Sequence, residues 1–266
     1  MLKELWFYLK IYFYISSQYI KGRMQHRIDF LLSALGLIVM NTAGYFSFWI
    51  ILRSVPSLNG WKFEEMLFMY AFSQLAGSPM GIFFDNLWNL RSHIVEGTFV
   101  KFYFKPLNML FYYTAEVLDI KGLSQSLLAL GVFVYASMKL SIHWNMVNLL
   151  ILLVTLFSSA LCMIGMMLMA ASSGFWILNA NAVMVFTSRM RELSRYPLTI
   201  FNAFFRYGLT LIIPVGFIGF YPAQFFLRPS ALSVWVYLSP FFGVLFFRLA
   251  YEIWKRGVNS YSGTGS

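Results

Sequence analysis

The sequence predicts an all-α membrane protein: a single transmembrane domain over residues 1–266 with six transmembrane helices and an N-terminal in-plane amphipathic helix. Three observations support this fold class. Hydrophobic residues make up 59% of the 266 residues and charged residues only 11%, against about 45–50% and about 25% in a soluble domain. Six long runs lack Asp, Glu, Lys and Arg. Basic residues concentrate in segments that a six-span arrangement places on one side of the membrane.

This composition excludes several other classes of protein. A soluble enzyme of this length could not cover so much apolar surface with polar side chains. The single cysteine, Cys162, allows no intrachain disulfide and no cysteine-built metal site. A polytopic helical membrane protein remains, because a helix satisfies its own backbone hydrogen bonds in lipid.

The six uncharged runs set the predicted spans. A spanning helix needs about 20 apolar residues, and five of the runs have that length. The fourth is 49 residues long and could hold two spans. We expect instead that its surplus, around residues 175–186, continues as a helix into the inner interface. The runs are residues 30–52, 66–84, 122–138, 140–188, 207–227 and 229–247.

Basic residues decide between six and seven spans. With six spans and both termini inside, inner segments hold 14 Lys and Arg and outer segments hold 4. The inner set includes Arg189, Arg191 and Arg195. Seven spans would give 10 against 8, so the six-span, N-in and C-in arrangement fits the positive-inside rule better. The same rule accounts for the formal net charge of +10, which on a soluble domain would indicate nucleic acid.

Residues 1–29 are predicted to be cytoplasmic, with an interfacial helix over the first 21. Lys3, Lys10, Ser17 and Lys21 recur at spacings of seven, seven and four, which places them on one polar stripe. Large apolar and aromatic residues fill the remaining positions, a pattern typical of a helix at the headgroup boundary. Simple anchoring explains such a helix.

Residues 85–121 form the predicted cytoplasmic segment between spans two and three. Asp85 is a candidate N-cap and Gly97 a candidate left-handed C-terminus. Between them, a narrow apolar stripe suits either a protein-docking surface or a solvated connector. The stripe consists of Leu87, Leu90 and Ile94, while Asn89, Arg91, Ser92, His93 and Glu96 face elsewhere.

A few polar residues fall in or near the spans. Arg206 either snorkels to the inner surface or faces the interior beside Asn202, with Glu116 and Asp119 as candidate partners. Asn41 and Gln74 are polar positions in the first and second spans. A polar residue at such a position more often forms a helix–helix hydrogen bond than part of a substrate path. Residues 214–223 (PVGFIGFYPA) make an unbroken helix improbable, so a broken or re-entrant outer end of span five is expected.

Motifs for chemistry are absent from the sequence. It contains no phosphate-cradling G-x-x-x-x-G-K-[ST] loop and no nucleophile elbow. His26, His93 and His143 are predicted on different loops and form no metal cluster. Carboxylates, which proton-driven carriers use, are nearly absent from the span centres. These features argue against an enzyme and weaken the case for a secondary transporter.

Three segments of the chain carry recognisable motifs. Residues 94–108 (IVEGTFVKFYFKPLN) follow span two. Residues 196–223 contain YPLTIF at the start and PVGFIGFYPA at the end. Residues 254–266 (WKRGVNSYSGTGS) have a basic stretch followed by YSxxGS. Together these segments resemble the permease subunits of ABC-2-type transporters, specifically bacterial permeases of this length, and the resemblance covers the whole chain in length, span number and order.

The resemblance implies a permease of type V exporter-like architecture in the bacterial plasma membrane. Such permeases pair as homodimers or with a sister chain, contact membrane lipids, and dock on two cytoplasmic ATPase subunits that bind ATP and Mg. This chain would then hold no cofactor or metal and perform no catalysis. Residues 85–97 would be the coupling helix, with Leu87, Leu90 and Ile94 toward the ATPase. The other residues expected to contribute to coupling are Arg91, His93, Glu96 and Gly97. A stand-alone ion-gradient carrier or channel, and a structural scaffold, are the alternatives.

Overall fold

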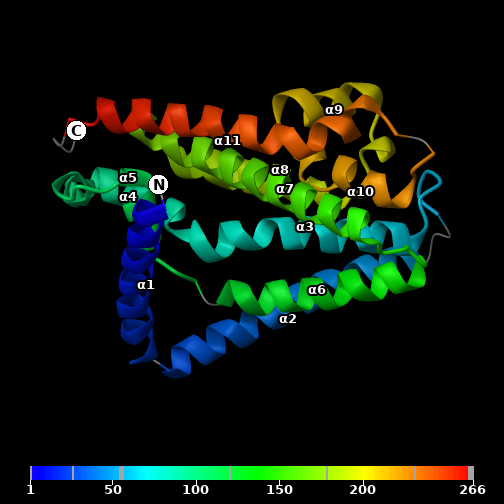
Figure 1. Cartoon of the computed structure of the whole chain (residues 1–266), viewed down its shortest axis with the longest axis horizontal. Coiled ribbons are helices and arrows are strands. Elements are labelled where there is room, and N and C mark those ends of the chain that lie inside the picture. Colours follow the sequence, from blue (N-terminus) through cyan, green and yellow to red (C-terminus); the bar gives the residue numbers. More distant parts are fainter. Residues whose placement is uncertain are drawn as a thin grey trace.

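The chain folds as a bundle of long helices that share one axis, with a first helix lying across one end (Figure 1). The computed structural model describes residues 2–25, 27–53, 57–119, 121–177, 179–230 and 232–262. Within these ranges no β-strand forms, and the only bridge joins Leu58 to Trp61. The all-helical prediction is therefore confirmed for the described part of the chain.

The first helix, α1 (Leu2–Met24), confirms the predicted N-terminal helix and extends it by one turn. It lies nearly at right angles to the bundle axis (Figure 1). Tyr8 packs edge-on against Phe111, with ring centroids 4.8 Å apart, while Trp6 and Phe13 are 67% and 70% exposed. One aromatic side of α1 is thus attached to the bundle and another remains uncovered, as an interfacial position would require.

Five long helices build the bundle: α2 (Arg27–Arg53), α3 (Phe63–Phe83), α6 (Lys121–Lys139), α7 (Met146–Ser172) and α11 (Val234–Ser260). The closest approach joins α7 to α11. Ser158 Oγ donates to Ser239 O at 2.6 Å, and Gly243 N donates to Ser158 Oγ at 3.0 Å. Small residues permit this approach, because they let two helix backbones come together.

Two described helices are long and apolar enough to cross a membrane: Met146–Phe175, which includes the short helix η3 (Ser173–Phe175), and α11. A third candidate is the pair Phe63–Phe83 and Asp85–Val95, bent by 63°. The chain is therefore a helical membrane protein with two or three such spans among its described residues. The count of six stays a prediction.

The path after α7 differs from the prediction for residues 175–186. The chain reverses, and α8 (Ala180–Glu192) runs back along α7, followed by η4 (Leu193–Arg195) and η5 (Leu198–Ile200). Ala180 and Met184 are 1% and 3% exposed. Burying this apolar side of α8 against the bundle removes it from water or headgroups, which a helix extending into the interface could not do.

The reversal also places three arginines, which were predicted on an inner segment, on a segment beside the bundle helices. Arg191 Nη1 lies 3.9 Å from the sulfur of Met163, nine residues before the end of α7, or about 13 Å along a helix rising 1.5 Å per residue. Arg195 lies over the ring of Tyr70 in α3, 5.2 Å from its centroid. Arg189, Arg191 and Arg195 therefore lie on a segment that ascends inside the bundle.

The predicted break near span five is confirmed. Four short pieces replace one helix: α9 (Ala203–Tyr207), the π-helix η6 (Gly208–Ile212), η7 (Val215–Phe217) and α10 (Phe220–Leu227). Their turn reaches the middle of α7, where Ser159 Oγ donates to Phe217 O at 3.0 Å. Gly219 is required there, because an added Cβ would lie 2.2 Å from Ser194 O.

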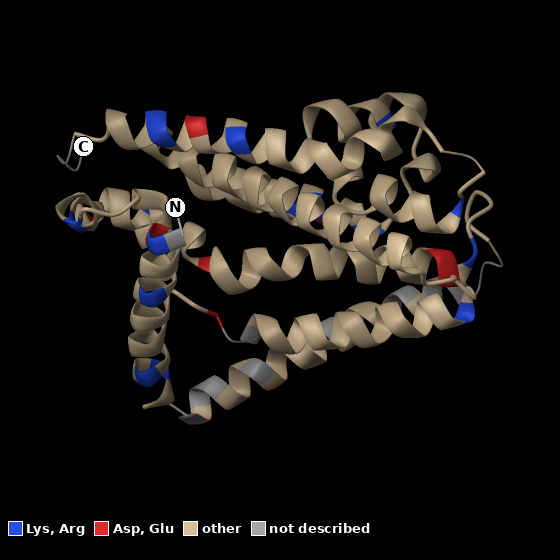
Figure 2. Ribbon diagram, viewed as in Figure 1, with Lys and Arg blue, Asp and Glu red and all other residues tan. Residues whose placement is uncertain are grey.

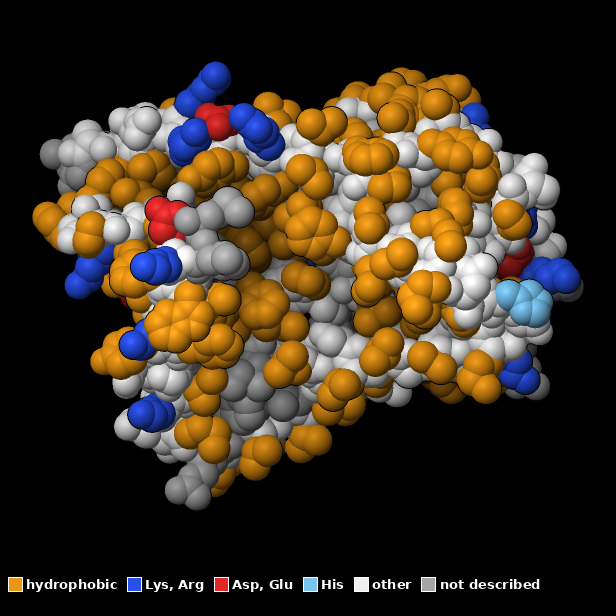
Figure 3. Space-filling model, in the orientation of Figure 1, with side chains coloured by type: hydrophobic (Ala, Val, Ile, Leu, Met, Phe, Trp, Pro, Cys, Tyr) orange, Lys and Arg blue, Asp and Glu red, His pale blue; other side chains and the backbone are white. Residues whose placement is uncertain are grey.

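The two ends of the bundle contain different segments of the chain. Both termini lie at the end that contains α4 and α5 (Figure 1), which we call the platform end. At the opposite end, Arg228 donates to Glu65 at 3.2 Å and to Gly60 O at 2.6 Å. Charged side chains lie mainly at the two ends, with hydrophobic side chains between them on the visible face (Figures 2 and 3). This distribution is typical of a membrane-spanning bundle.

Candidate functional site

A compact group of short helices forms the platform, which we define as residues 85–115. It comprises η1 (Asp85–Asn89), α4 (Leu90–Val95), η2 (Thr98–Phe104) and α5 (Met109–Ala115). The predicted single helix over residues 85–97 is thus split in two, and Asp85 is the first residue of η1, with Phe84 at the N-cap position. Gly97 is left-handed, as predicted, with φ of 71°. This turn folds η2 back beside α4.

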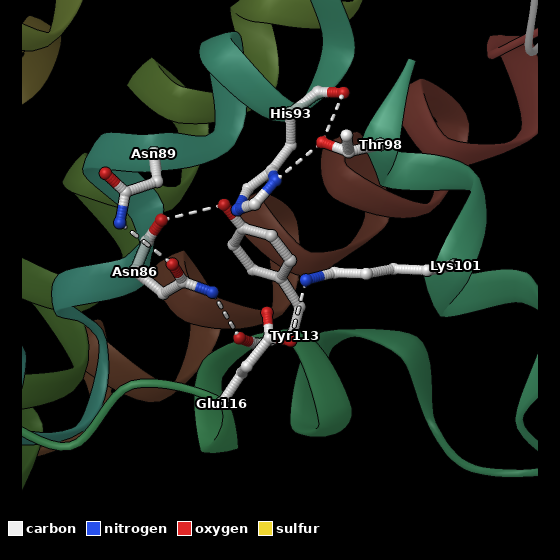
Figure 4. A network of polar contacts seen from close by, with 7 residues as sticks. All are labelled: Asn86, Asn89, His93, Thr98, Lys101, Tyr113 and Glu116. Carbon is white, nitrogen blue, oxygen red and sulfur yellow. Dashed lines mark hydrogen bonds and ion pairs between the residues drawn. The ribbon is translucent and has the colours of Figure 1, made fainter. Parts of the chain in front are cut away.

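Hydrogen bonds hold the platform's short helices together (Figure 4). Asn86 Nδ2 donates to Tyr113 O at 2.7 Å, and Tyr113 Oη donates to Asn86 O at 2.7 Å. His93 Nδ1 lies 2.9 Å from Thr98 Oγ1. The two reciprocal bonds attach η1 to α5, and each gives a buried side-chain donor a backbone carbonyl as its partner.

An aromatic cluster joins the platform to the bundle. Phe99 and Tyr113 are fully buried and Trp254 of α11 is 1% exposed. The Phe99 ring lies 5.3 Å from that of Phe175, at the end of α7, and 5.3 Å from that of Tyr261. Tyr113 and Trp254 have centroids 5.6 Å apart. The rings therefore join the platform to η3, directly after α7, and to α11.

The apolar stripe of Leu87, Leu90 and Ile94 was predicted to face the ATPase, but the structure buries two of these three side chains. Leu87 and Leu90 are 1% and 0% exposed and pack into the core of this chain. Ile94 is partly buried, near Gly174. An apolar stripe indicates a buried face, but it does not say whether the covering surface belongs to the same chain. Here the bundle itself covers the stripe.

Other platform side chains are uncovered. Phe104, Val95 and Val100 are 75%, 56% and 41% exposed. Glu96 is exposed beside them, whereas Arg91 is partly buried. We call the three exposed apolar side chains of η2 and the end of α4 the tip (Val95, Val100 and Phe104); polar and charged platform residues are exposed as well.

Among the predicted polar residues that the structure describes, the two carboxylates lie apart from Arg206. Glu116 pairs with Lys101 of the platform at 2.7 Å, so it is not a partner of Arg206. Asp119 N donates to Ile82 O at 3.1 Å, near the start of α6. Both carboxylates therefore belong to the platform end.

The remaining predicted residues are dispersed. Asn202 caps α9 by accepting from Phe205 N at 3.0 Å. Arg206 lies over the Tyr207 ring and lines a cavity of about 280 Å³ next to α10. Gln74 is 7% exposed in the middle of α3. The side chain of Asn41 lies outside the described residues.

A second feature, which the sequence did not predict, is a polar cavity of about 160 Å³ between α3, α6, α7 and α8. Arg191 and Arg195 line it, together with Ser73 and Ser194, whose hydroxyls share a hydrogen bond. A usable signal existed: the 49-residue run had length for two crossings. The lining residues are Ser73, Gln74, Gly77, Ser78, Met80, Gly81, Asp85, Trp88, Gly122, Gln125, Met163, Arg191, Ser194 and Arg195.

Comparison with known proteins identifies the family. The family described as ABC-2 family transporter protein matches residues 38–265. The chain belongs to the ABC-2 transporter family. No curated protein and no solved structure matches it. The match covers the bundle, the platform and the broken segment, so all three belong to the family domain.

Membership makes this ABC-2 chain a multi-pass protein of the cell membrane and a component of membrane transport. The resemblance noted in the sequence is confirmed. Among the described residues, no group of three or more His, Cys, Asp and Glu could hold a metal ion. The features available for function are therefore the platform, its tip and the basic cavity.

His93 makes the platform of this ABC-2 protein sensitive to acid. Burial, and secondarily the charge of Lys101, lowers the pKa of His93 below its usual 6.5. The unfolded chain therefore takes up a proton at higher pH than the folded chain does, so the stabilisation present above pH 6.5 is lost as pH falls toward the lowered value.

We expect thermal unfolding of the wild type to shift downward between about pH 7 and about pH 5, and the shift to be smaller in His93→Gln. Thr98 remains within reach of the Gln side chain, which preserves a neutral hydrogen bond. Superimposable pH profiles for the two proteins would contradict this assignment.

Proposed function

We propose that the chain is the transmembrane permease subunit of an ATP-driven exporter, forming the translocation path as a dimer and coupled to separate cytoplasmic ATPase subunits. The single observation that carries the proposal, beyond family membership, is the platform. It is anchored to α7 and α11 by buried rings and presents an exposed apolar tip. Such a construction transmits force from a docked partner into the bundle.

The helix order supports six crossings with both termini on the platform side. In the proposed order α2, α3, α6 and α7 cross in turn, and α8 with η4 and η5 makes the fifth crossing. Ala180 begins near Gly174 at the platform end, and Thr199 accepts from Trp61 Nε1 at 2.7 Å at the opposite end. The α9–α10 segment then re-enters to mid-depth, and α11 returns.

We propose that the ATPase docks on the tip and not on Leu87 and Leu90, which are buried. Apolar side chains that insert into a partner's groove dominate binding energy. ATP-driven closure of the ATPase pair would push on the tip, and the aromatic cluster would pass the movement to α7 and α11. Arg91, His93 and Gly97 then act by holding the platform's shape.

A stand-alone carrier is less well supported. That alternative requires Glu116 or Asp119 in a transport path, whereas Glu116 is paired with Lys101 at the platform. An ion pair outside the helix bundle offers no route for an ion through it.

The decisive experiment is co-purification of this chain from membranes that also contain the ABC ATPase subunits of the same cell. We expect a stable complex whose ATP hydrolysis depends on the permease. An ATPase that never associates, with turnover indifferent to this chain, would refute the proposal.

Phe104→Ala should weaken ATPase binding by about tenfold or more, because it removes the most exposed apolar side chain of the tip. Glu96→Lys should reduce coupled hydrolysis by changing the charge beside the tip. Glu252→Lys is the matched control, since Glu252 is an exposed carboxylate on α11 paired only locally with Lys255. If the Phe104 variant binds and couples like the wild type, the tip is not the docking surface.

A further inference from the structure

The interior cavity holds an imbalance of charge. Arg191 and Arg195 both line it, one turn apart on α8 and η4. The nearby Glu192 makes its ion pair with Arg189, at 3.4 Å. Among the described residues, no carboxylate lies within the 4.0 Å of an ion pair from either guanidinium. The one acidic residue of the lining, Asp85, lies at the platform end.

The surroundings of the two guanidinium groups do not replace a counter-ion. Arg191 has the thioether sulfur of Met163 at 3.9 Å, which is a weak acceptor. Arg195 has the face of Tyr70, 5.2 Å from the ring centroid. A cation–π contact offsets only part of the cost of withdrawing a charge from water. Arginines within membrane segments are costly, and they mark binding sites and pathways.

The cavity is built to receive an oxyanion. Its volume of about 160 Å³ far exceeds the roughly 10–15 Å³ that one water needs. Besides the arginines, it presents the hydroxyls of Ser73 and Ser194 and the amide of Gln125, all able to donate hydrogen bonds. Arginine pairs with phosphate and carboxylate through two parallel hydrogen bonds. Two guanidinium groups and several neutral donors therefore share a lining whose one carboxylate is that of Asp85.

We propose that this cavity binds an oxyanion, a phosphate or carboxylate group, through Arg191 and Arg195. The group is either a free anion or the head group of an amphiphile whose chains extend outside the cavity. Apolar lining residues such as Met80, Met163 and Trp88 suit the second source. Binding needs neither transport nor the ATPase, so this inference stands or falls separately from the proposed function.

The test uses the full-length purified chain without the ATPase. Delipidated protein is exposed to equal amounts of phosphatidylglycerol and phosphatidylcholine, and retained lipid is counted by native mass spectrometry. We expect a preference of about tenfold or more for the anionic lipid, since each charged hydrogen bond contributes at that level. A wild type that neither prefers the anionic lipid nor binds inorganic phosphate overturns the proposal, and this arm needs no variant.

Variants and a second ligand locate the site and its source. Arg191→Gln combined with Arg195→Gln should abolish the preference, while Arg189→Gln should retain it, because Arg189 is exposed on the same helix and outside the lining. An equal preference in the double variant and the wild type overturns the proposal. If inorganic phosphate displaces the lipid, a free anion is sufficient for binding. If the lipid is retained, the ligand is an amphiphile. In both cases the double variant should no longer bind the ligand.

Discussion

Gly243→Ala is expected to unfold or separate the α7–α11 pair. A Cβ built on Gly243 lies 1.7 Å from Ser158 O and 2.7 Å from Ser158 Oγ. The obstacle is helix backbone, which cannot move aside as a flexible side chain would, so the two helices must part. They would lose the hydrogen bonds of Ser158 with Gly243 and Ser239. We expect destabilisation of at least about 3 kcal/mol, at or beyond the upper end of overpacking effects.

The measurement is thermal unfolding in detergent together with the yield of monodisperse protein. Gly131→Ala on α6 is the control, because a Cβ there meets nothing within 4 Å. That variant should unfold at the same temperature as the wild type or slightly above it, since alanine favours helix more than glycine does. A Gly243 variant as stable as the control would show that α7 and α11 do not pack as closely as described.

Phe99→Ala should detach the platform from the bundle. Phe99 is fully buried and its ring contacts rings from α5, η3, α11 and the segment after it. Removing a buried phenylalanine costs about 3–5 kcal/mol. The loss should be local, so limited proteolysis within residues 96–107 should accelerate before the bundle unfolds. Communication with a docked ATPase should fall with it.

Phe104→Ala provides the matched comparison, because Phe104 lies on the same short helix and is 75% exposed. Its removal should change stability by no more than about 0.5 kcal/mol, while weakening ATPase binding as described above. The two variants thus separate anchoring from docking. Equal proteolysis rates for Phe99→Ala and the wild type would show that the aromatic cluster does not hold the platform.

Local sequence patterns predicted individual elements well. The heptad-like spacing of lysines predicted α1, and Gly97 predicted a left-handed turn, because each depends on residues close in the chain. The Pro and Gly residues of residues 214–223 predicted a broken helix for the same reason. Composition predicted the membrane class, since the apolar excess is a property of the whole chain.

The functional residues were harder to predict. The resemblance predicted that the apolar stripe of Leu87 and Leu90 faces the ATPase, whereas these side chains pack into the core of this chain. The positive-inside rule predicts that Arg191 and Arg195 lie on an inner segment outside the spans. Their position depends on the reversal after Phe175, which follows from how α8 packs against α7.

The sequence by itself determined that this is a helical membrane protein of the ABC-2 family with a helical segment after its second long helix. Only the tertiary structure decided which platform side chains are exposed and which arginines enter the bundle. The physical reason is the range of the interactions. Turn and helix preferences act over a few residues, whereas burial depends on contacts such as Phe99–Trp254 and Arg191–Met163, which join segments far apart in the chain.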